Sequence, residues 1–566
     1  MRIEMLHSFR NRALNIGILG LLGVGISIAA NPKLSAELEG VDGRKPVDVI
    51  ITFKQAPTFS DHAKVLIRGG SVLRSLELVK GGAYRLMGSK LVELADDPNV
   101  EYISPDHEVH GALQFAGPAI NANIAFQNGH DGTGVGVAII DSGIMTHPDT
   151  SNRIVYNENF VPNIGNDYFD RYGHGTHVAG IVGGDAAESA GPTFTHTFRG
   201  IAPNVELINL RVLDQNGVGQ DSSVIAALQR AIQLKSSYNI RVINLSLGRP
   251  VTESYTKDPL CQAVEQAWKA GIVVVVAAGN SGRNNSANTS GYGTISAPGN
   301  DPYAITVGAM KDEGTVTRSD DLVASYSSKG PTLLDHIVKP DIVAPGNLIV
   351  SSIPAGLALT NSYPQNAVND DYYMLNGPNQ SSTFYFTLSG TSMAAPMVSG
   401  AAALMIQKDP SLTPDTVKAR LMKTATKTFP KSSTATDPTT GQVYTSYYDA
   451  FTIGAGYLDA WAALNSTDTL LASQNAQSPA VQYNTITGQV QMVEAANVVW
   501  GSNVVWGSNV VWGSTVLSGT NVVWGSNVVW GSSTMTGFNV VWGSNVVWGS
   551  STPQSELATI AIYGEK

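Results

Sequence analysis

The sequence contains a single cysteine, Cys261, among 566 residues, so no intramolecular disulfide bond can form. A chain without disulfides needs a large hydrophobic core, and this length with 43% hydrophobic residues is enough for several domains. Cys261 lies in the apolar-periodic stretch from Leu260 to Trp268. That stretch predicts a helix with a buried cysteine, and no catalytic-thiol context surrounds it.

Charged residues are also scarce, at 14% against about a quarter in a typical soluble protein. The net charge of -10 leaves no basic excess, so the composition gives no support for nucleic-acid binding. Gly, Ser, Thr and Asn are abundant instead, which favours an extracellular protein over a cytosolic one.

Long hydrophobic runs are rare, and the clearest one spans Ala13 to Ala30. Arginines precede it, and Ser27-Ile28-Ala29 resembles a small-residue cleavage site. We therefore predict a signal peptide over residues 1–30 and a secreted protein, the alternative being an uncleaved membrane anchor. The apolar run from Gly271 to Ala278 is too short to span a bilayer and predicts a buried parallel strand.

Residues 31–115 are expected to form a small α+β segment. Strand-like runs occur at Val47 to Phe53, Ala83 to Met87 and Val100 to Ile103, and a helix-like run occurs at Lys90 to Ala95.

Residues 116–466 alternate short strands rich in Val, Ile and Ala with amphipathic helices. This alternation predicts an α/β domain whose parallel sheet is covered by helices on both faces. The strands expected are Val135 to Ile140, Glu206 to Val212, Val242 to Ser246 and Ile272 to Ala277, and the clearest helices are Val224 to Lys235 and Ser392 to Gln407.

The chain after residue 466 has a different composition. Residues 467–496 are rich in Ser, Thr, Gln and Asn and are typical of a linker. Residues 497–550 repeat the hexad Asn-Val-Val-Trp-Gly-Ser in unbroken phase, and 551–566 form a short tail. Because six is a multiple of the strand period, each hexad returns the same side chain to the same face. Two hypotheses stay open: a module that contacts a surface or polymer through its tryptophans, and a tail without fixed structure.

Asp141 follows the apolar run Val137 to Ile140, at the predicted carboxyl end of a buried strand. Open α/β sheets place their functional sites at such ends, where an acid can hold an imidazole in one tautomer, although a lone Asp here is more often a cap or turn residue. Two histidines, His174 and His177, lie in the motif Gly-His-Gly-Thr-His-Val-Ala-Gly. Spacing alone does not choose between them as a base, and it also leaves a metal pair open.

Ser392 lies in Gly-Thr-Ser-Met-Ala-Ala-Pro, at the predicted start of a helix whose N–H groups and dipole would stabilise a developing negative charge. The alternative is an ordinary N-cap serine. Ala394 replaces the second glycine of the α/β-hydrolase elbow, and the order Asp, His, Ser is wrong for that fold. Asn280 ends an apolar run and is a candidate amide donor to an oxyanion, or a simple turn residue.

Together these motifs resemble the signatures of subtilisin-like serine proteases, in the order of that family. The resemblance covers residues 116–466 and includes Asn244 to Gly248, Lys339 to Gly346 and Gly454 to Ala460. Residues 47–106 also resemble the inhibitor-type propeptide of the family, which implies a ferredoxin-like α+β unit.

The resemblance implies a catalytic triad of Asp141, His174 and Ser392, with Asn280 as oxyanion donor. It further implies that Ser246, Leu247 and Gly248 pair with substrate as a strand, and that Ala277, Ala278 and Gly279 wall the first specificity pocket. The chemistry needs no cofactor. Many members bind a structural calcium, and Asp149 matches one ligand, but Asp185 to Arg199 lacks the usual Asn-rich ligand run, which argues against that site.

The sequence therefore predicts a secreted serine endopeptidase with protein or peptide substrates and a broad preference for large hydrophobic residues before the scissile bond. Its own propeptide, at 31–115, is the expected intramolecular chaperone and inhibitor. The alternatives are a catalytically inactive surface-binding protein on the same fold and the related carboxyl-type peptidase, which carries Glu in place of the base and Asp in place of the oxyanion donor. His174 and Asn280 argue against the latter.

Overall fold

The fold is taken from a computed structural model of the chain. The structure describes residues 31–35, 38, 41–76, 80–105, 113–286, 289–437, 440–470, 474–484, 489–493, 511–512, 522–523 and 564–565. The chain divides after Val109 into two compact units, a few residues before the boundary expected at residue 115. The predicted signal peptide lies outside the described residues. Within them, no helix is long and apolar enough to cross a membrane.

The small unit is an antiparallel sheet with two helices. Its strands have the order β2-β3-β1-β4, and helices occur between β1 and β2 and between β3 and β4, which is a ferredoxin-like arrangement. Its core is built from one face of the sheet, including Val49, Ile51, Tyr84 and Ile103. The elements are β1 (Pro46–Phe53), α1 (Phe59–Ile67), β2 (Ser71–Leu76), β3 (Gly81–Met87), η3 (Gly88–Lys90), α2 (Leu91–Ala95) and β4 (Val100–Pro105).

The large unit is built on an eight-stranded sheet in the order β11-β10-β9-β8-β5-β7-β6, with β12 also paired to β10. All of these pairs are parallel except β10 with β11. The strands are β5 (Gly136–Asp141), β6 (Ile154–Asn159), β7 (Glu206–Arg211), β8 (Ile240–Leu245), β9 (Val273–Ala277), β10 (Ile305–Lys311), β11 (Leu322–Val323) and β12 (Ile342–Pro345).

The central strands are buried along their whole length. Every residue of β5, β9 and β10 is buried, whichever face its side chain takes. Since successive side chains of a strand point to opposite faces, the sheet is covered on both sides. This explains why the strands read as continuous apolar runs, and it confirms the predicted parallel sheet with helices.

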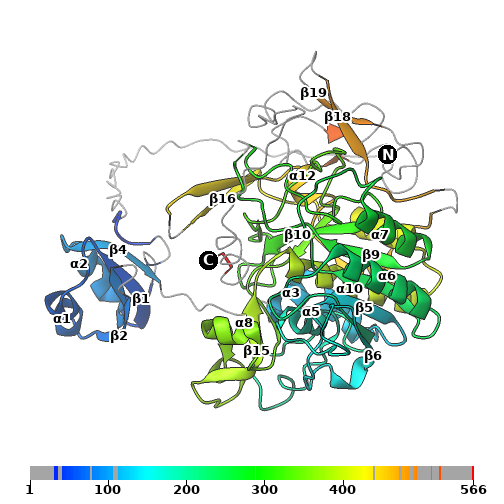
Figure 1. Cartoon of the computed structure of the whole chain (residues 1–566). Helices are drawn as coiled ribbons and strands as arrows, with labels where there is room; N and C mark the ends of the chain where they lie inside the picture. The colour runs from blue at the N-terminus through cyan, green and yellow to red at the C-terminus, as the bar shows by residue number, and fades with distance from the viewer. Residues whose placement is uncertain are drawn as a thin grey trace, which may run out of the picture. The chain divides into compact units, whose positions relative to one another are not determined.

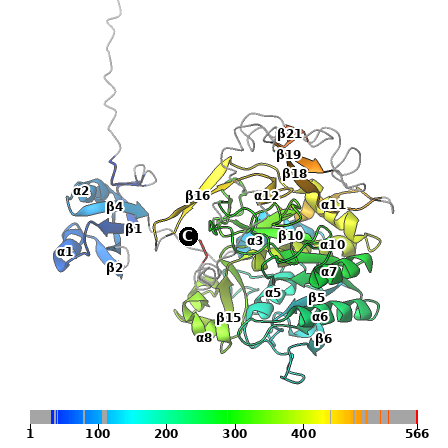
Figure 2. The same cartoon turned by 45° about the horizontal axis from the view of Figure 1, so that its top comes forward.

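Helices cover this sheet in packed pairs. Helices α5 and α10 pack against each other, as do α6 and α7, which lie side by side in Figures 1 and 2. Helix α7 begins at Pro259, and the Asp258 side chain accepts a hydrogen bond from the N–H of Leu260 at 3.0 Å. The helices are α3 (Leu113–Ala119), α4 (Ala122–Gln127), α5 (His174–Gly183), α6 (Asp221–Leu234), α7 (Pro259–Lys269), α10 (Thr391–Lys408), α11 (Pro414–Thr424), α12 (Ala450–Ile453) and α13 (Ala460–Asn465).

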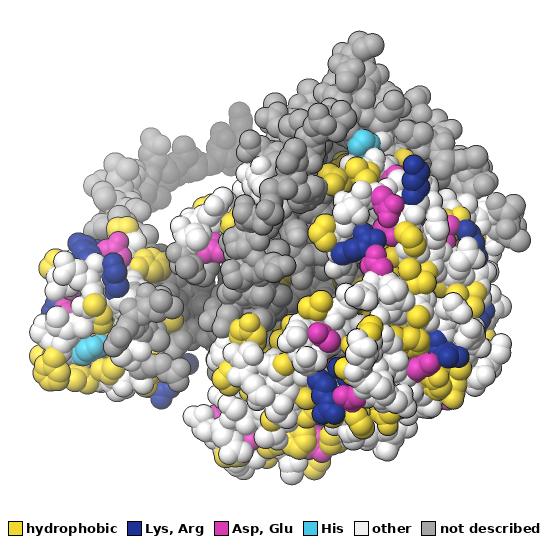
Figure 3. Space-filling model, viewed as in Figure 1, with side chains coloured by type: hydrophobic (Ala, Val, Ile, Leu, Met, Phe, Trp, Pro, Cys, Tyr) yellow, Lys and Arg dark blue, Asp and Glu magenta, His cyan; other side chains and the backbone are white. Residues whose placement is uncertain are grey.

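Cys261 lies on α7 as predicted, fully buried, with its Sγ 3.4 Å from Asn300 Oδ1. Burial raises the pKa of this thiol, as expected for a core residue rather than a reactive one. Figure 3 shows basic and acidic side chains interspersed over the visible face of the large unit.

A second sheet in the large unit has the order β13-β15-β14, and β15 leads directly toward α10. The hairpins β16–β17 and β18–β19 follow later in the chain. The elements of this region are β13 (Ile349–Ser352), α8 (Ala358–Ser362), η5 (Pro364–Asn366), β14 (Ala367–Asn369), α9 (Asp370–Tyr373), β15 (Ser381–Leu388), β16 (Ser432–Thr436), β17 (Val443–Tyr447), β18 (Ala480–Asn484) and β19 (Gln489–Val493), and a short helix η4 (Ser151–Arg153) lies between β5 and β6.

The structure differs from the prediction of a linker over residues 467–496. Ala476, Ser478 and Val481 are buried, and the N–H of Ser478 donates to the Pro302 carbonyl at 3.0 Å. Composition alone missed these contacts because polar residues can be buried when hydrogen-bonded. In the hexad region, β20 (Val511–Trp512) and β21 (Val522–Val523) form an antiparallel pair, and the rest lies outside the described residues.

Candidate active site

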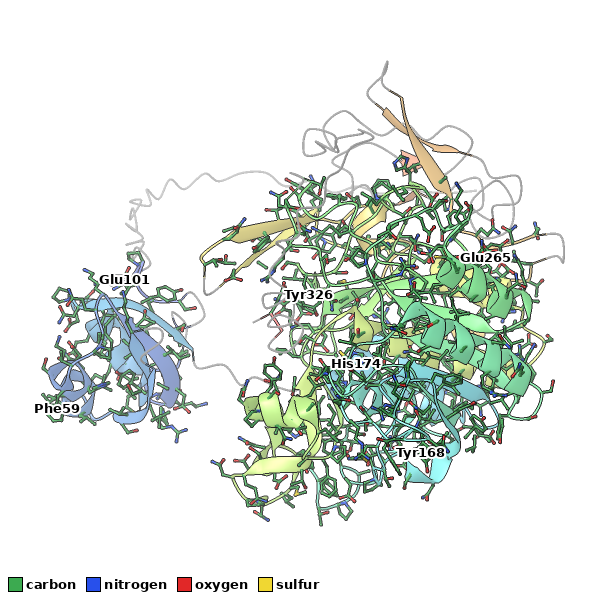
Figure 4. All side chains as sticks on the ribbon, in the orientation of Figure 1. Phe59, Glu101, Tyr168, His174, Glu265 and Tyr326 are labelled. Atoms are coloured by element: carbon green, nitrogen blue, oxygen red, sulfur yellow. The ribbon has the colours of Figure 1, made fainter. Side chains whose placement is uncertain are left out.

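His174 is the first residue of α5, where Figure 4 labels it, and Asp141 is the last residue of β5. The Nδ1 atom of His174 lies 2.8 Å from Asp141 Oδ1. Asp141 is fully buried and its Oδ1 also accepts the N–H of Ser142, whereas the His174 side chain is 17% exposed. An acid with no access to solvent therefore faces one ring nitrogen, and this pairing favours a proton on Nδ1 and a free Nε2.

The electrostatic surroundings favour a protonatable imidazole at this position. Burial lowers the pKa of His174, but the Asp141 charge and hydrogen bond, together with the Asp170 charge, outweigh it and raise the pKa. The imidazolium that forms when His174 accepts a proton is thereby stabilised.

Asp170 holds the start of α5 and was missed by the sequence analysis. Its buried carboxylate accepts hydrogen bonds from the N–H of Tyr172 at 2.9 Å and of Gly173 at 2.7 Å. It also accepts the N–H and hydroxyl of Thr176, at 2.9 and 2.6 Å. These donors include first-turn groups that have no intrahelical acceptor. Asp170 lies four residues before His174, outside the N-cap and first-turn positions where helix-start signals occur, so no local signal marked it.

His177 lies three residues further along and is fully buried. Its Nε2 is 3.0 Å from the Ile349 carbonyl and 3.1 Å from the Phe386 carbonyl, so it ties α5 to β13 and β15. Burial and the neighbouring His174 lower the pKa of His177 to about 3. A neutral histidine that donates to two carbonyl groups suits a structural role, and its surroundings differ from those of His174, whose Nδ1 faces Asp141.

Ser392 is the second residue of α10, which begins after Gly390. Its N–H therefore has no acceptor within the helix. Its hydroxyl donates to the Ser246 carbonyl at 3.2 Å and not to His174. A buried series of hydrogen bonds runs from Ser399 to Asn244 at 2.8 Å, to Ser246 at 2.9 Å, and to the Ser392 carbonyl at 2.8 Å. These hydrogen bonds hold the backbone of Ser392 in position.

Asn280 follows β9 and faces the start of α10. Its Oδ1 accepts the N–H of Thr391 at 2.9 Å and the Thr391 hydroxyl at 3.0 Å. Because Oδ1 accepts both hydrogen bonds from Thr391, the Nδ2 group points the other way and can act as a hydrogen-bond donor. A β-carbon added at Gly390 would lie 3.1 Å from Nδ2, so the glycine leaves this donor open. Thr391, which orients the amide, was not predicted.

The predicted substrate-binding residues lie at the ends of two adjacent strands. Ser246, Leu247 and Gly248 follow β8, with Leu247 partly exposed and Gly248 exposed, while Ala277 ends β9 and precedes Ala278 and Gly279. Strands β8 and β9 are parallel neighbours, so their carboxyl ends meet at one edge.

Ser296 adds a feature that the sequence analysis did not anticipate. A β-carbon at Gly248 would lie 2.7 Å from Ser296 Oγ, and one at Gly279 would lie 2.8 Å from the same atom. The space left by both glycines is therefore bordered by a hydroxyl, not only by apolar groups.

The Asp149 carboxylate is engaged by hydrogen-bond donors. Its Oδ2 accepts hydrogen bonds from the hydroxyl groups of Tyr385 at 2.8 Å and Ser352 at 3.3 Å, and its Oδ1 accepts the N–H of Glu188 at 3.0 Å. Calcium requires several oxygen ligands around one point, whereas these groups point hydrogen atoms at the carboxylate. Among the residues that the structure describes, no group of three or more acidic, His or Cys side chains is placed to hold a metal ion.

Comparison with known proteins gives a match to the Subtilase family over residues 132–487, which carry all four candidate catalytic residues. The chain is 39% identical over 340 residues to Serine protease AprX of Bacillus subtilis (strain 168), covering 59% of this chain and 71% of that protein. It is 34% identical over 430 residues to Subtilisin E of the same organism, covering 74% and 94%. It is also 35% identical over 333 residues to Alkaline protease of Alkalihalobacillus alcalophilus, covering 58% and 70%.

Proposed function

The chain belongs to the subtilase family and is a serine endopeptidase, and we propose that it cleaves peptide bonds through an acyl-enzyme on Ser392. His174 is the general base, Asp141 orients it, and the Ser392 N–H and Asn280 Nδ2 bind the oxyanion. The observation that carries this proposal is the 2.8 Å contact between His174 Nδ1 and the buried Asp141.

The proposed reaction begins when the Ser392 hydroxyl turns about its Cα–Cβ bond from the Ser246 carbonyl toward His174 Nε2. Ser392 Oγ attacks the substrate carbonyl while its proton passes to Nε2, and the charge on Nδ1–H is balanced by Asp141. The carbonyl oxygen becomes an oxyanion beside the N-terminus of α10. His174 then gives its proton to the leaving amine. His174 next takes a proton from water as the water oxygen attacks the acyl carbonyl, and it returns that proton to Ser392 Oγ as the acyl C–O bond breaks and the acid leaves.

Substrate recognition is proposed to use the two strand ends beside the site. The backbone of Ser246 to Gly248 pairs with the substrate as an added strand, because Gly248 is exposed and carries no side chain. The side chain before the scissile bond enters the space bordered by Ala277 to Gly279 and by Ser296. We expect broad cleavage after large hydrophobic or aromatic residues. A strict preference for Arg or Lys in a peptide library would contradict this expectation.

The small unit is proposed to act as a propeptide that first assists folding and then inhibits. Met87 and Tyr102 are exposed on the sheet face opposite its core, where they lie with Ile50 and an Arg85–Asp48 ion pair. An uncovered, partly apolar sheet face suits a unit that docks on another surface. In this proposal Ser392 cuts its own precursor, so Ser392→Ala should accumulate a protein that retains residues 31–115.

Secretion is part of the proposal and rests on the signal-like sequence of residues 1–30. Contact with a cell surface or polymer is proposed for the hexads at 497–550 because tryptophans repeat there in one phase. No observation favours the alternative of an inactive binding protein.

A burst experiment tests the acyl-enzyme directly. Rapid mixing with a chromogenic ester should release product in an initial burst equal to the enzyme concentration, because acylation precedes slower deacylation. Ser392→Ala should abolish the burst, whereas Ser411→Ala, which removes an exposed hydroxyl, should leave it unchanged. A full burst from Ser392→Ala would refute the assignment.

A further inference from the structure

The segment Gly564–Glu565 is seated in the large unit, far in sequence from the residues that it contacts. Glu565 is only 5% exposed. Its Oε1 accepts hydrogen bonds from Arg283 Nη2 at 2.8 Å, from the N–H of Ser325 at 2.9 Å and from the Ser325 hydroxyl. In Figures 1 and 2 this red segment lies between β16 and β15, and Figure 4 labels Tyr326, which follows Ser325.

The backbone of Glu565 is recognised as well as its side chain. Its N–H donates to Asn347 Oδ1 at 2.8 Å, and its carbonyl accepts from Asn347 Nδ2 at 2.8 Å. Gly564 has a positive φ of 67°, and an added β-carbon would lie 2.5 Å from Ser389 Oγ. The site therefore requires glycine followed by an acid. We call the four residues Arg283, Ser325, Asn347 and Ser389 the Gly-Glu socket.

The Arg283 side chain is also positioned by groups other than Glu565. The Arg283 side chain is 9% exposed, its Nε donates to Ser325 Oγ at 2.6 Å, and its guanidinium lies 4.8 Å from the centre of the Tyr444 ring. Asp437 is a further partner, at 3.3 Å. A guanidinium positioned by several groups presents its remaining N–H donors to a carboxylate with little loss of entropy.

Two residues of the socket lie close in sequence to the candidate catalytic residues. Arg283 is three residues after Asn280, and Ser389 is three residues before Ser392. The N–H of Gly390 donates to the Gly346 carbonyl at 2.7 Å, next to Asn347.

We propose that the Gly-Glu socket binds Gly564–Glu565 of the same chain and thereby fastens the distal end of the hexad segment to the catalytic unit. The chain before the hexads packs on the same unit through the buried Ala476, Ser478 and Val481, so the hexads are attached at both ends. It follows that a cut within the hexads does not release the distal fragment. The proposal is independent of the catalytic mechanism and of any partner of the hexads.

The test uses the full chain in a Ser392→Ala background, so that the protein cannot digest itself. A recognition site for a specific protease replaces Thr515 to Thr520, an interruption of the hexads, and the chain is cut there. Size-exclusion chromatography then measures whether the distal fragment stays with the catalytic unit. We expect retention in the parent, and release from Glu565→Gln and Gly564→Ala, each weakening retention on the order of tenfold or more. Glu265→Gln, which removes a carboxylate from an exposed ion pair, is the matched control and should retain the fragment.

A competition experiment on the cut parent avoids dependence on the folding of variants. An excess of the peptide Ile-Tyr-Gly-Glu-Lys should displace the fragment, and the same peptide with Gln for Glu should not. Release of the fragment from the parent without competitor would overturn the proposal. So would equal retention in Glu565→Gln, or equal displacement by both peptides, because the carboxylate would then contribute nothing.

Discussion

The two helices that carry His174 and Ser392 begin in different ways. Both follow a glycine, Gly173 with φ of 113° and Gly390 with φ of 151°. At α5 a buried carboxylate, Asp170, accepts the free N–H groups of the first turn. At α10 the acceptor is the neutral amide oxygen of Asn280, which takes the N–H of Thr391.

In the proposed mechanism, this difference lets the positive ends of two helix dipoles serve two purposes. At α5 the positive end of the dipole faces the buried Asp170 carboxylate, whose charge contributes to raising the pKa of His174 and so favours the protonated imidazole. At α10 the acceptor among the described residues is a neutral amide, so in the proposed mechanism the dipole and the N–H of Ser392 stay available for an oxyanion that exists only during the reaction. Stabilisation of that kind lowers the barrier without tightening substrate binding.

The largest expected effect comes from removing the groups that are proposed to react. Asp141→Ala, His174→Ala and Ser392→Ala should each remove nearly all turnover, since the three act as one unit and single losses can reach about 10⁶-fold, a magnitude known from a related subtilisin rather than from this geometry. Turnover of a chromogenic peptide by folded protein checks this.

His177 supplies the control on the same helix. His177→Asn keeps a side-chain donor for the Ile349 and Phe386 carbonyl groups, and should lower the unfolding temperature far more than the turnover of the folded fraction. If folded His177→Asn were as inactive as His174→Ala, the assignment of the base would be wrong.

The second largest effect is expected at the start of α10, where the neutral Asn280 amide accepts the N–H of Thr391. Asn280→Ala should fold and lose on the order of 10²–10³ in turnover with little change in KM, again a magnitude known from a related subtilisin. Thr391→Val should lose less, because it removes only the hydroxyl that helps to orient the amide. A loss confined to KM would show that Asn280 binds the ground state instead.

A smaller effect is expected at the start of α5, where the Asp170 carboxylate should influence how activity depends on pH. His174 must be neutral to act as base, so activity falls as the pH drops through its pKa, which is raised above the ordinary value. The charge of Asp170 contributes to that rise, so Asp170→Asn should move the acid limb of the kcat profile to lower pH. If the acid limb of folded Asp170→Asn moved to higher pH instead, the proposed effect of the Asp170 charge on His174 would be contradicted.

The smallest effect is expected for the hexads, which contribute no residue to the proposed active site. Deleting residues 497–550 while keeping 551–566 should leave turnover of a small peptide unchanged, because no catalytic motif lies in the hexads. A large loss in folded, matured protein would mean that the hexads act on one of the two helix starts.

Much of the fold was predictable because burial on both faces of a sheet leaves a clear pattern. The apolar run before Asp141 became β5, and the run before Asn280 became β9, with bounds within one or two residues. Periodicity likewise predicted α6 and α7. In each of these elements, the pattern of apolar residues indicates which side chains are buried.

What sequence could not give is the pairing of groups distant along the chain. Spacing could not separate His174 from His177, because the carbonyl groups that hold His177 come from residues 349 and 386. Ser296 and Thr391 carry no local signal of the contacts that they make across the site. Glu565 lies in the short tail at 551–566 and carries no local sign of its contact, since only the fold brings Arg283 to it.

The central claim, that His174 activates Ser392 as the nucleophile, is tested most directly by labelling. The protein is treated with a serine-directed fluorophosphonate and digested, and mass spectrometry locates the adduct. We predict one adduct, on the peptide containing Ser392, formed far more slowly in His174→Ala. An adduct on another residue, or equally fast labelling of Ser392 without His174, would contradict the account.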